Sequence, residues 1–179
     1  ATGMRRGEIM GLKWSDLDFE KKIISIERTA VEVGSKVEIN SPKTKDSIRK
    51  LYIGDSLIKL LKNWKKEQSE KCNFALNRKL SEKDFLFHNI FAENKDVPIY
   101  HPTSVTQCWN RCQKELNLQG IRFHDLRHFH AIQLLIQGKA NIKDIQNRLG
   151  HSDSAITMDT YMRYVPEERN KEVGASADE

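Results

Sequence analysis

The chain has 179 residues, of which 38% are hydrophobic and 31% charged, proportions typical of one soluble globular domain with a largely polar surface. Thirty basic and 25 acidic residues give a formal net charge of +5 at pH 7, which is compatible with a polyanionic partner but common among ordinary proteins. No run of eighteen apolar residues occurs, and the N-terminus lacks the apolar stretch of a signal peptide, so neither a membrane span nor secretion is predicted. A cytoplasmic protein is expected, in which Cys108 and Cys112 are small packing residues.

The first half of the chain predicts a helix, a small sheet and a second helix. The first helix is expected over residues 2–12, with Trp14 closing the stretch. Strand-like runs separated by turn signals then predict a small antiparallel sheet formed by residues 23–26, 36–39 and 50–53. Asp55 is expected to cap a helix that extends to about residue 71. The apolar side of this helix is predicted to comprise Leu57, Ile58, Leu60, Leu61 and Trp64.

The second half predicts four more helices and one short strand. The strand is expected at residues 85–87, and Pro102 marks the start of a helix to about residue 116. A helix over residues 124–137 is apolar around most of its circumference, which predicts burial on several sides. The last two helices are expected at residues 142–149 and around residues 157–164. The predicted fold class is therefore α+β, mostly helical with a small antiparallel β-sheet, in one domain over residues 1–165 with a C-terminal tail over 166–179.

His124 and Arg127 form the first motif that suggests chemistry. They are three residues apart, on one face and in the first turn of a predicted helix, where free backbone N–H groups and the helix dipole favour a phosphate. Taken alone, a structural histidine beside a surface arginine explains the same pattern.

Three other segments are equally ambiguous in isolation. Residues 2–8 place an arginine near a helix start with an acid three residues later, which is by itself a charged pair. Residues 41–49 form a basic segment that a solvated hairpin would explain. His151 is followed ten residues later by Tyr161, which could be one more aromatic residue on a helix.

Together and in this order, the segments resemble the tyrosine recombinase family, the phage-type integrases. The family pattern is T-G-x-R-x-x-E, a hairpin lysine, H-x-x-R, L-G-H and a nucleophilic tyrosine. Its counterparts here are residues 2–8, Lys43, residues 124–127, residues 149–151 and Tyr161. The sequence of residues 157–161, T-M-D-T-Y, resembles that of integrases of mobile elements from Gram-positive bacteria. The resemblance implies the tyrosine recombinase catalytic-domain fold and site-specific breakage and rejoining of DNA.

The resemblance also implies how the phosphate is held and attacked. Arg5 and Arg127 would clamp the non-bridging oxygens of the scissile phosphate, a role suited to planar guanidinium forks. Tyr161 would attack phosphorus, forming a 3′-phosphotyrosine and releasing a 5′-hydroxyl. Because the protein linkage keeps the phosphodiester energy, neither ATP nor a metal cofactor is expected.

Proton transfer or hydrogen bonding to the phosphate is implied for the three remaining members of the six-residue site. Lys43 would protonate the departing 5′ oxygen. His124 would accept the tyrosine proton or hydrogen-bond the phosphate, and His151 would donate a hydrogen bond to the phosphate. Glu8 would be structural, orienting the helix that holds Arg5.

Two of the basic assignments have close competitors. Arg6 adjoins Arg5, but the T-G-x-R register selects Arg5. Lys45 competes with Lys43, and the Lys-Thr pair of the hairpin turn favours Lys43.

The nucleophile has a competitor too. Tyr164 lies three residues after Tyr161, but the spacing from His151 and the preceding Asp-Thr favour Tyr161. The chain also departs from many relatives, which carry histidine where Arg163 stands, a change expected to be tolerated because it lies beyond the nucleophile.

Two other functions compete with recombination as interpretations of the same residues. A zinc enzyme could use His124, His128 and His151, but no glutamate follows His124 and Arg127 would set a positive charge beside the metal. A non-catalytic DNA-binding relative of the same fold would be expected to have lost at least one of the six site residues, and all six are present.

The partners implied by the resemblance are double-stranded DNA and, for the full-length protein, three further copies in a tetramer on paired DNA sites. Relatives carry a helical DNA-clamping domain before the first arginine motif, so the chain is expected to be an N-terminally truncated catalytic fragment with weak DNA affinity on its own. Arg49, Arg122 and the helix at residues 55–71 are candidates for base contacts.

Overall fold

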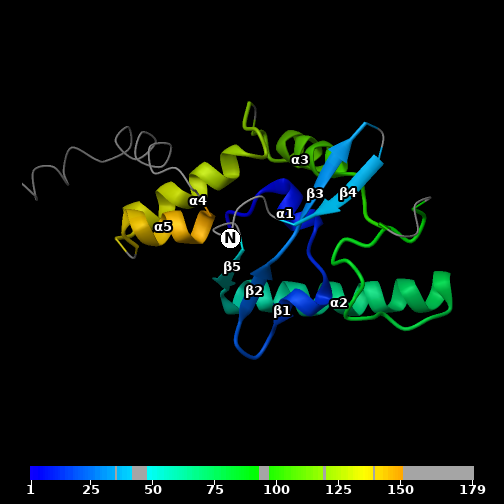
Figure 1. Cartoon of the computed structure of the whole chain (residues 1–179). Coiled ribbons are helices and arrows are strands. Elements are labelled where there is room, and N and C mark those ends of the chain that lie inside the picture. The colour runs from blue at the N-terminus through cyan, green and yellow to red at the C-terminus, as the bar shows by residue number, and fades with distance from the viewer. Residues whose placement is uncertain (35, 42–47, 93–96, 119, 139, 151–179) are drawn as a thin grey trace, which may run out of the picture.

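A computed structural model of the chain describes residues 1–34, 36–41, 48–92, 97–118, 120–138 and 140–150 (Figure 1). Three of the six expected site residues, Lys43, His151 and Tyr161, lie outside these described residues, as does the helix expected around 157–164. None of the described helices is long and apolar enough to cross a membrane.

The N-terminal helix is shorter than expected. α1 spans Arg6–Met10 and is followed by the short 3₁₀ helix η1 (Trp14–Asp16). Gly3 adopts φ +68 and Arg5 is extended, so the residues before Arg6 cannot continue a right-handed helix. The segment before α1 is therefore an extended arm that leads Arg5 to the helix start.

Two antiparallel sheets replace the single sheet that was expected. β1 (Leu17–Asp18), β2 (Ile23–Ile26) and β5 (Arg49–Tyr52) form one sheet in the order β1-β2-β5, in which Ile24 pairs with Leu51. β3 (Thr29–Val33) and β4 (Lys36–Asn40) form a separate two-stranded ribbon. β3 was not expected, although its β-branched residues are followed by Gly34, which adopts φ +60 in the turn to β4.

The long helix α2 spans Asp55–Leu76, five residues beyond its expected end. Its N-cap is Gly54 rather than Asp55, which instead forms an ion pair with Lys22 (2.6 Å). Leu60, expected on the apolar side, is 65% exposed because the helix packs along a narrower stripe than its sequence suggested. The strand expected at residues 85–87 is reduced to a single β-bridge between Lys13 and Phe85.

Three helices follow in the second half, close to their expected positions: α3 (Pro102–Glu115), α4 (Asp125–Ile136) and α5 (Ile142–Leu149). Figure 1 shows α4 and α5 side by side, and α3 beside the β3–β4 ribbon. The expectation of burial around most of α4 is wrong, because Phe129 and Ile136 are more than half exposed. Cys108 on α3 is exposed too, so it is not the packing residue that was expected.

The main core surrounds Trp14, which is fully buried. It joins the arm before α1, the three-stranded sheet and the start of α2, through Met4, Leu12, Ile24, Ile26, Leu51, Ile53, Ile58 and Leu86. A separate cluster holds α4 against α5 and consists of Ala131, Leu135, Ile145 and Leu149. The extended arm thus runs from the main core towards the α4–α5 pair.

Candidate active site

Arg5 is the N-cap residue of α1, where it binds Glu8 of the same motif. The backbone N–H of Arg5 donates to Oε2 of Glu8 (2.7 Å), and its guanidinium Nη1 donates to Oε1 of the same carboxylate (2.9 Å). Glu8 is 4% exposed, so this carboxylate is fixed in the interior. Nη2 of Arg5 donates to the carbonyl of Gly150 (3.0 Å), yet the side chain remains 41% exposed. One part of the guanidinium is therefore held in place while another part faces solvent.

Arg127 approaches the same place from the first turn of α4. Its guanidinium donates from Nη1 to the carbonyl of Gly3 (2.6 Å) and from Nη2 to the carbonyl of Leu149 (2.7 Å). Among the described residues its Nε has no hydrogen-bond partner, although the residue is only 3% exposed. Burial, together with the charge of Arg5, lowers the pKa of Arg127 to about 10, which leaves it charged at neutral pH. The guanidinium groups of Arg5 and Arg127, which bind the adjacent carbonyls of Gly150 and Leu149, thus repel each other. A bound oxyanion would stabilise this arrangement.

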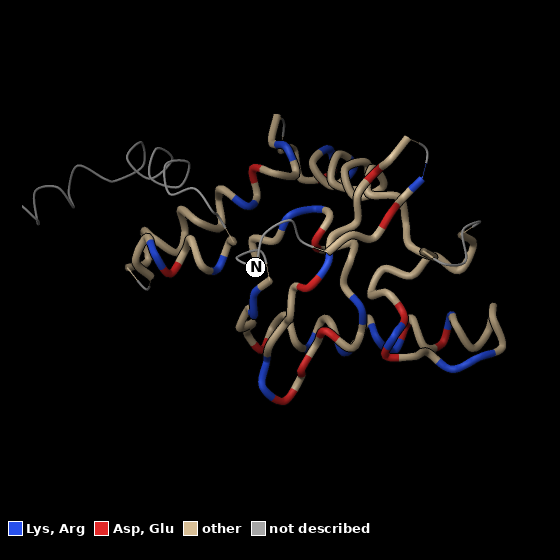
Figure 2. The backbone as a smooth tube through the Cα atoms, in the orientation of Figure 1, with Lys and Arg blue, Asp and Glu red and all other residues tan. Residues whose placement is uncertain are grey.

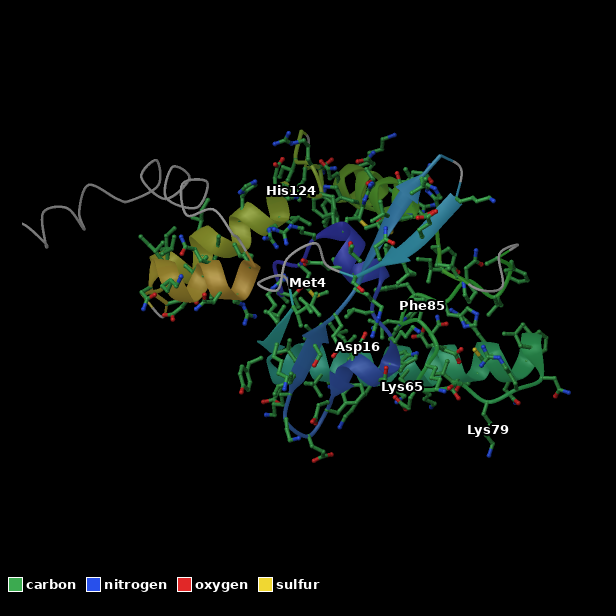
Figure 3. All side chains as sticks on the ribbon, viewed as in Figure 1. Met4, Asp16, Lys65, Lys79, Phe85 and His124 are labelled. Carbon is green, nitrogen blue, oxygen red and sulfur yellow. The ribbon has the colours of Figure 1, made fainter. Side chains whose placement is uncertain are left out.

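His124 is the N-cap residue of α4 (Figure 3). Its ring lies edge-on to that of His128, with 5.1 Å between the ring centroids. Burial lowers the pKa of His124 below its ordinary value, and the charges of His128, Arg127 and Arg5 act in the same direction. His124 is therefore neutral at pH 7 and able to accept a proton or a hydrogen bond.

Three of the six expected site residues are brought together in the described structure: Arg5, His124 and Arg127. They come from two segments about 120 residues apart, joined where Arg127 binds Gly3. The described chain ends at Gly150, against the guanidinium of Arg5. Lys43, His151 and Tyr161 are outside the described residues, so their positions remain predictions.

Arg49, one of the candidates for a base contact, instead lies buried beside Arg5 and Glu8. Its side chain is 6% exposed and forms a two-pronged ion pair with Glu8, in which both distances are 2.9 Å. Its Nε also donates to the carbonyl of Arg148 (2.7 Å). The hypothesised base contact is incompatible with this buried position. The alternation of side chains along a strand could have predicted the burial of Arg49, because Arg49 lies on the same face of β5 as buried Leu51.

The electrostatics of Glu8 follow from these partners. Burial by itself would raise the pKa of this carboxyl group, but the hydrogen bonds and charge of Arg49, with the hydrogen bonds of Arg5, outweigh burial and lower the pKa. Glu8 is thus an anion at neutral pH. It neutralises part of the positive charge that Arg5, Arg49 and Arg127 concentrate around it.

One group of potential metal ligands occurs among the described residues, away from this site. Atoms of Cys72, Asp84 and His88 lie within 4.8 Å of one another. The carboxylate of Asp84, however, already accepts two hydrogen bonds from the guanidinium of Arg78, at 2.7 and 2.9 Å. A fixed cation beside the only acidic ligand disfavours a divalent metal, so the group fits a packing role better. The histidine set considered from the sequence includes His151, which is outside the described residues.

The chain belongs to the Phage integrase family, whose sequence profile matches residues 1–168. It is 33% identical to the ICEBs1 integrase of Bacillus subtilis over 99% of this chain and 46% of that protein. It is 32% identical to a XerC-like tyrosine recombinase of Caldanaerobacter subterraneus over 96% of this chain and 45% of that protein. The chain thus spans about half the length of the curated relatives it matches.

Solved structures support the same fold. The Tn1549 transposon integrase, in complex with circular intermediate DNA, matches 97% of this chain and 56% of that chain with a TM-score of 0.72 at 23% identity. The XerA recombinase matches 98% of this chain and 54% of that chain with a TM-score of 0.62 at 21% identity. The expected tyrosine recombinase catalytic-domain fold, α+β and mostly helical, is confirmed, as is the resemblance on which it was based.

Proposed function

We propose that this chain is the catalytic domain of a site-specific DNA recombinase, which cleaves and rejoins strands through a 3′-phosphotyrosine on Tyr161 without metal or ATP. The observation that carries the proposal is the convergence of Arg5, Arg127 and neutral His124 at one place. Two guanidinium groups can bind the phosphodiester, and one neutral imidazole can accept the proton of the nucleophile. The family match and the recombinase names of the relatives support the same chemistry.

Phosphate binding is the role of the two arginines. Each guanidinium carries five N–H donors in a rigid fork. Arg5 and Arg127 each use Nη groups on carbonyl or carboxylate oxygens, and the remaining N–H groups are available to the non-bridging oxygens of a phosphate. These bonds would strengthen as negative charge grows on those oxygens in the transition state, which lowers the barrier.

The covalent step exchanges one phosphate ester for another. The Oη atom of Tyr161 forms a bond to phosphorus while the bond from phosphorus to the 5′ oxygen breaks. The tyrosine proton goes to His124, which its depressed pKa keeps ready to accept it, and Lys43 donates a proton to the departing oxygen. His151 adds a hydrogen bond to the phosphate. Rejoining is the reverse reaction, with a 5′-hydroxyl as the nucleophile, so no external energy source is required.

The proposed partner is double-stranded DNA, as in the DNA complexes of the Tn1549 transposon integrase. Basic and acidic residues are intermixed along the described chain (Figure 2), so the proposal rests on the two arginines and not on a broadly positive face. We further propose a homotetramer on paired DNA sites in the full-length protein, acting in the cytoplasm where the DNA is. The catalytic domain is assigned to residues 1–165 and the tail to residues 166–179.

A covalent-adduct assay tests the proposal. DNA that becomes linked to the protein in its host cells is trapped by rapid denaturation and sequenced, and a nicked duplex with that sequence becomes the substrate. We expect an adduct on a denaturing gel that forms equally well in EDTA and is lost in Tyr161→Phe. Tyr164→Phe is the matched control and should retain the adduct.

Two outcomes would contradict the proposal. An adduct that persists in Tyr161→Phe would assign the chemistry to another residue. Specific binding of the duplex without any adduct would favour the alternative, a non-catalytic DNA-binding relative of the same fold.

A further inference from the structure

Glu8 is shared by two arginines with different surroundings. Its Oε1 accepts from Nη1 of Arg5 and from Nη1 of Arg49, both at 2.9 Å. Its Oε2 accepts from the backbone N–H of Arg5 (2.7 Å) and from Nη2 of Arg49 (2.9 Å). Arg49 and Glu8 each have 6% of their side chain exposed, whereas 41% of the Arg5 side chain is exposed. The buried arginine therefore fixes the plane of the carboxylate, and the carboxylate holds the exposed arginine.

Arg49 also contacts the second group that holds Arg5. Its Nε donates to the carbonyl of Arg148 (2.7 Å), and its guanidinium lies against the α-carbon of Gly150, where a Cβ would come within 2.9 Å of Nη1. The carbonyl of Gly150 is the other acceptor for Arg5. The two residues that bind the Arg5 guanidinium among the described residues, Glu8 and Gly150, thus both lie against Arg49.

We infer that Arg49 is a positioning residue for Arg5, orienting that guanidinium towards the scissile phosphate through Glu8 and Gly150. Arg49 does not bind the phosphate itself, because its Nη1 and Nη2 donate to the two oxygens of Glu8 and its Nε donates to the carbonyl of Arg148. A lysine at this position would keep the charge but could not bind both carboxylate oxygens in one plane. The inference rests on the proposed function for its catalytic consequence, but the contact from Arg49 to Arg5 can be measured without catalysis.

The kinetic test compares two substrates with Arg49→Lys in the natural full-length protein. One substrate has the ordinary scissile phosphate, and the other has a methylphosphonate, in which a neutral methyl group replaces one charged oxygen. An arginine that stabilises the charge of the phosphate contributes less to the rate of adduct formation on the neutral substrate. We expect Arg49→Lys to slow adduct formation on the phosphate by about 10²-fold, the cost of a displaced binding group, with DNA affinity unchanged. On the methylphosphonate the loss should be much smaller.

A matched control separates positioning from general stabilisation. Arg28 forms another mostly buried ion pair, with Asp16 (2.5 Å), outside the site. Arg28→Lys should lower the melting temperature but leave the ratio of rates on the two substrates as in the wild type. If Arg49→Lys slowed both substrates by the same factor, or did not slow the phosphate substrate, the inference would be wrong.

A second measurement needs no DNA. The Nη–H signal of Arg5, identified by its loss in Arg5→Lys, should exchange slowly with solvent in the wild type, because Nη1 and Nη2 donate to Glu8 and Gly150. It should exchange clearly faster in Arg49→Lys. Arg28→Lys should leave it unchanged. An unchanged Arg5 resonance in Arg49→Lys would overturn the inference. Failure of the wild type to form any adduct would instead reject the proposed function, and the resonance would still decide the role of Arg49.

Discussion

At the scale of single residues, Glu8 shows how the interior of this domain tolerates charge. Removing a carboxylate and a guanidinium from water is costly, and the cost is offset only when hydrogen bonds satisfy both groups. Glu8 accepts from Arg5 and from Arg49, and Arg49 in turn donates to the carbonyl of Arg148. Each of these charged groups is therefore stable only while its partners are present.

Glu8→Ala is accordingly expected to destabilise the fold strongly. It leaves the buried Arg49 guanidinium without its counter-ion, a loss of about 3–5 kcal/mol in the free energy of unfolding. Glu82→Ala is the matched control, because Glu82 pairs with Lys65 at 2.6 Å but is 63% exposed, and about 1 kcal/mol or less is expected there. Urea unfolding of the two variants measures the difference, and equal losses would show that burial of the Glu8 pair is unimportant.

At the scale of elements, the ends of α4 and α5 show the same backbone feature in different surroundings. Gly138 after α4 has φ +65 and Gly150 after α5 has φ +66, the left-handed region that favours glycine. A Cβ on Gly138 would meet nothing within 4 Å, whereas a Cβ on Gly150 would meet the Arg49 guanidinium at 2.9 Å. Only the end of α5 is packed against the site.

Gly150→Ala should therefore cost more than Gly138→Ala. Both variants pay about 1–2 kcal/mol for a left-handed alanine. Gly150→Ala also displaces Arg49, for roughly 1–3 kcal/mol more. Thermal or urea unfolding of the pair measures the excess, and losses of the same size would mean that Arg49 moves aside freely.

At the scale of the whole molecule, His130 marks the place where four parts of the chain meet. Nε of Arg148 donates to Nε2 of His130 (3.1 Å), and Nη1 of Arg148 donates to the carbonyl of Tyr52 (3.1 Å). Gly3 packs against the His130 ring, where a Cβ would come within 2.6 Å. The arm before α1, β5, α4 and α5 are thus held together by a histidine that must be neutral to accept its hydrogen bond.

The pH dependence of stability should reflect this histidine. Burial, with the nearby charge of Arg148, lowers the pKa of His130 to about 4. Between pH 4 and about 6.5 the unfolded chain binds more protons at this site than the folded one, so stability falls as pH drops through that window. His130→Gln keeps an acceptor but does not titrate, and should lose less stability between pH 6.5 and 4.5, by on the order of 2 kcal/mol. Chemical unfolding at several pH values measures how the free energy of unfolding of each protein changes with pH. The same change in the wild type and in His130→Gln would contradict the role given to His130.

Local signals predicted many of the elements. The helices α3, α4 and α5 and the strands β2 and β4 lie close to their expected residues, because periodicity and turn residues act over a few positions. Asp55 was expected as a helix cap and Leu60 as a buried residue, and both predictions were wrong. The cap of α2 and the burial of Leu60 both depend on the parts of the chain against which α2 packs. Those parts are distant in sequence, so the local sequence does not encode them.

The sequence by itself determined the family and the candidate chemistry, because the order and spacing of short motifs are properties of the chain alone. It named Arg5, His124 and Arg127, which the described structure brings together. Only the tertiary structure revealed what holds them: the sharing of Glu8 by Arg5 and Arg49, and the close approach of Arg49 to Gly150. These contacts join residues up to about a hundred positions apart, and they depend on packing geometry that no short motif encodes.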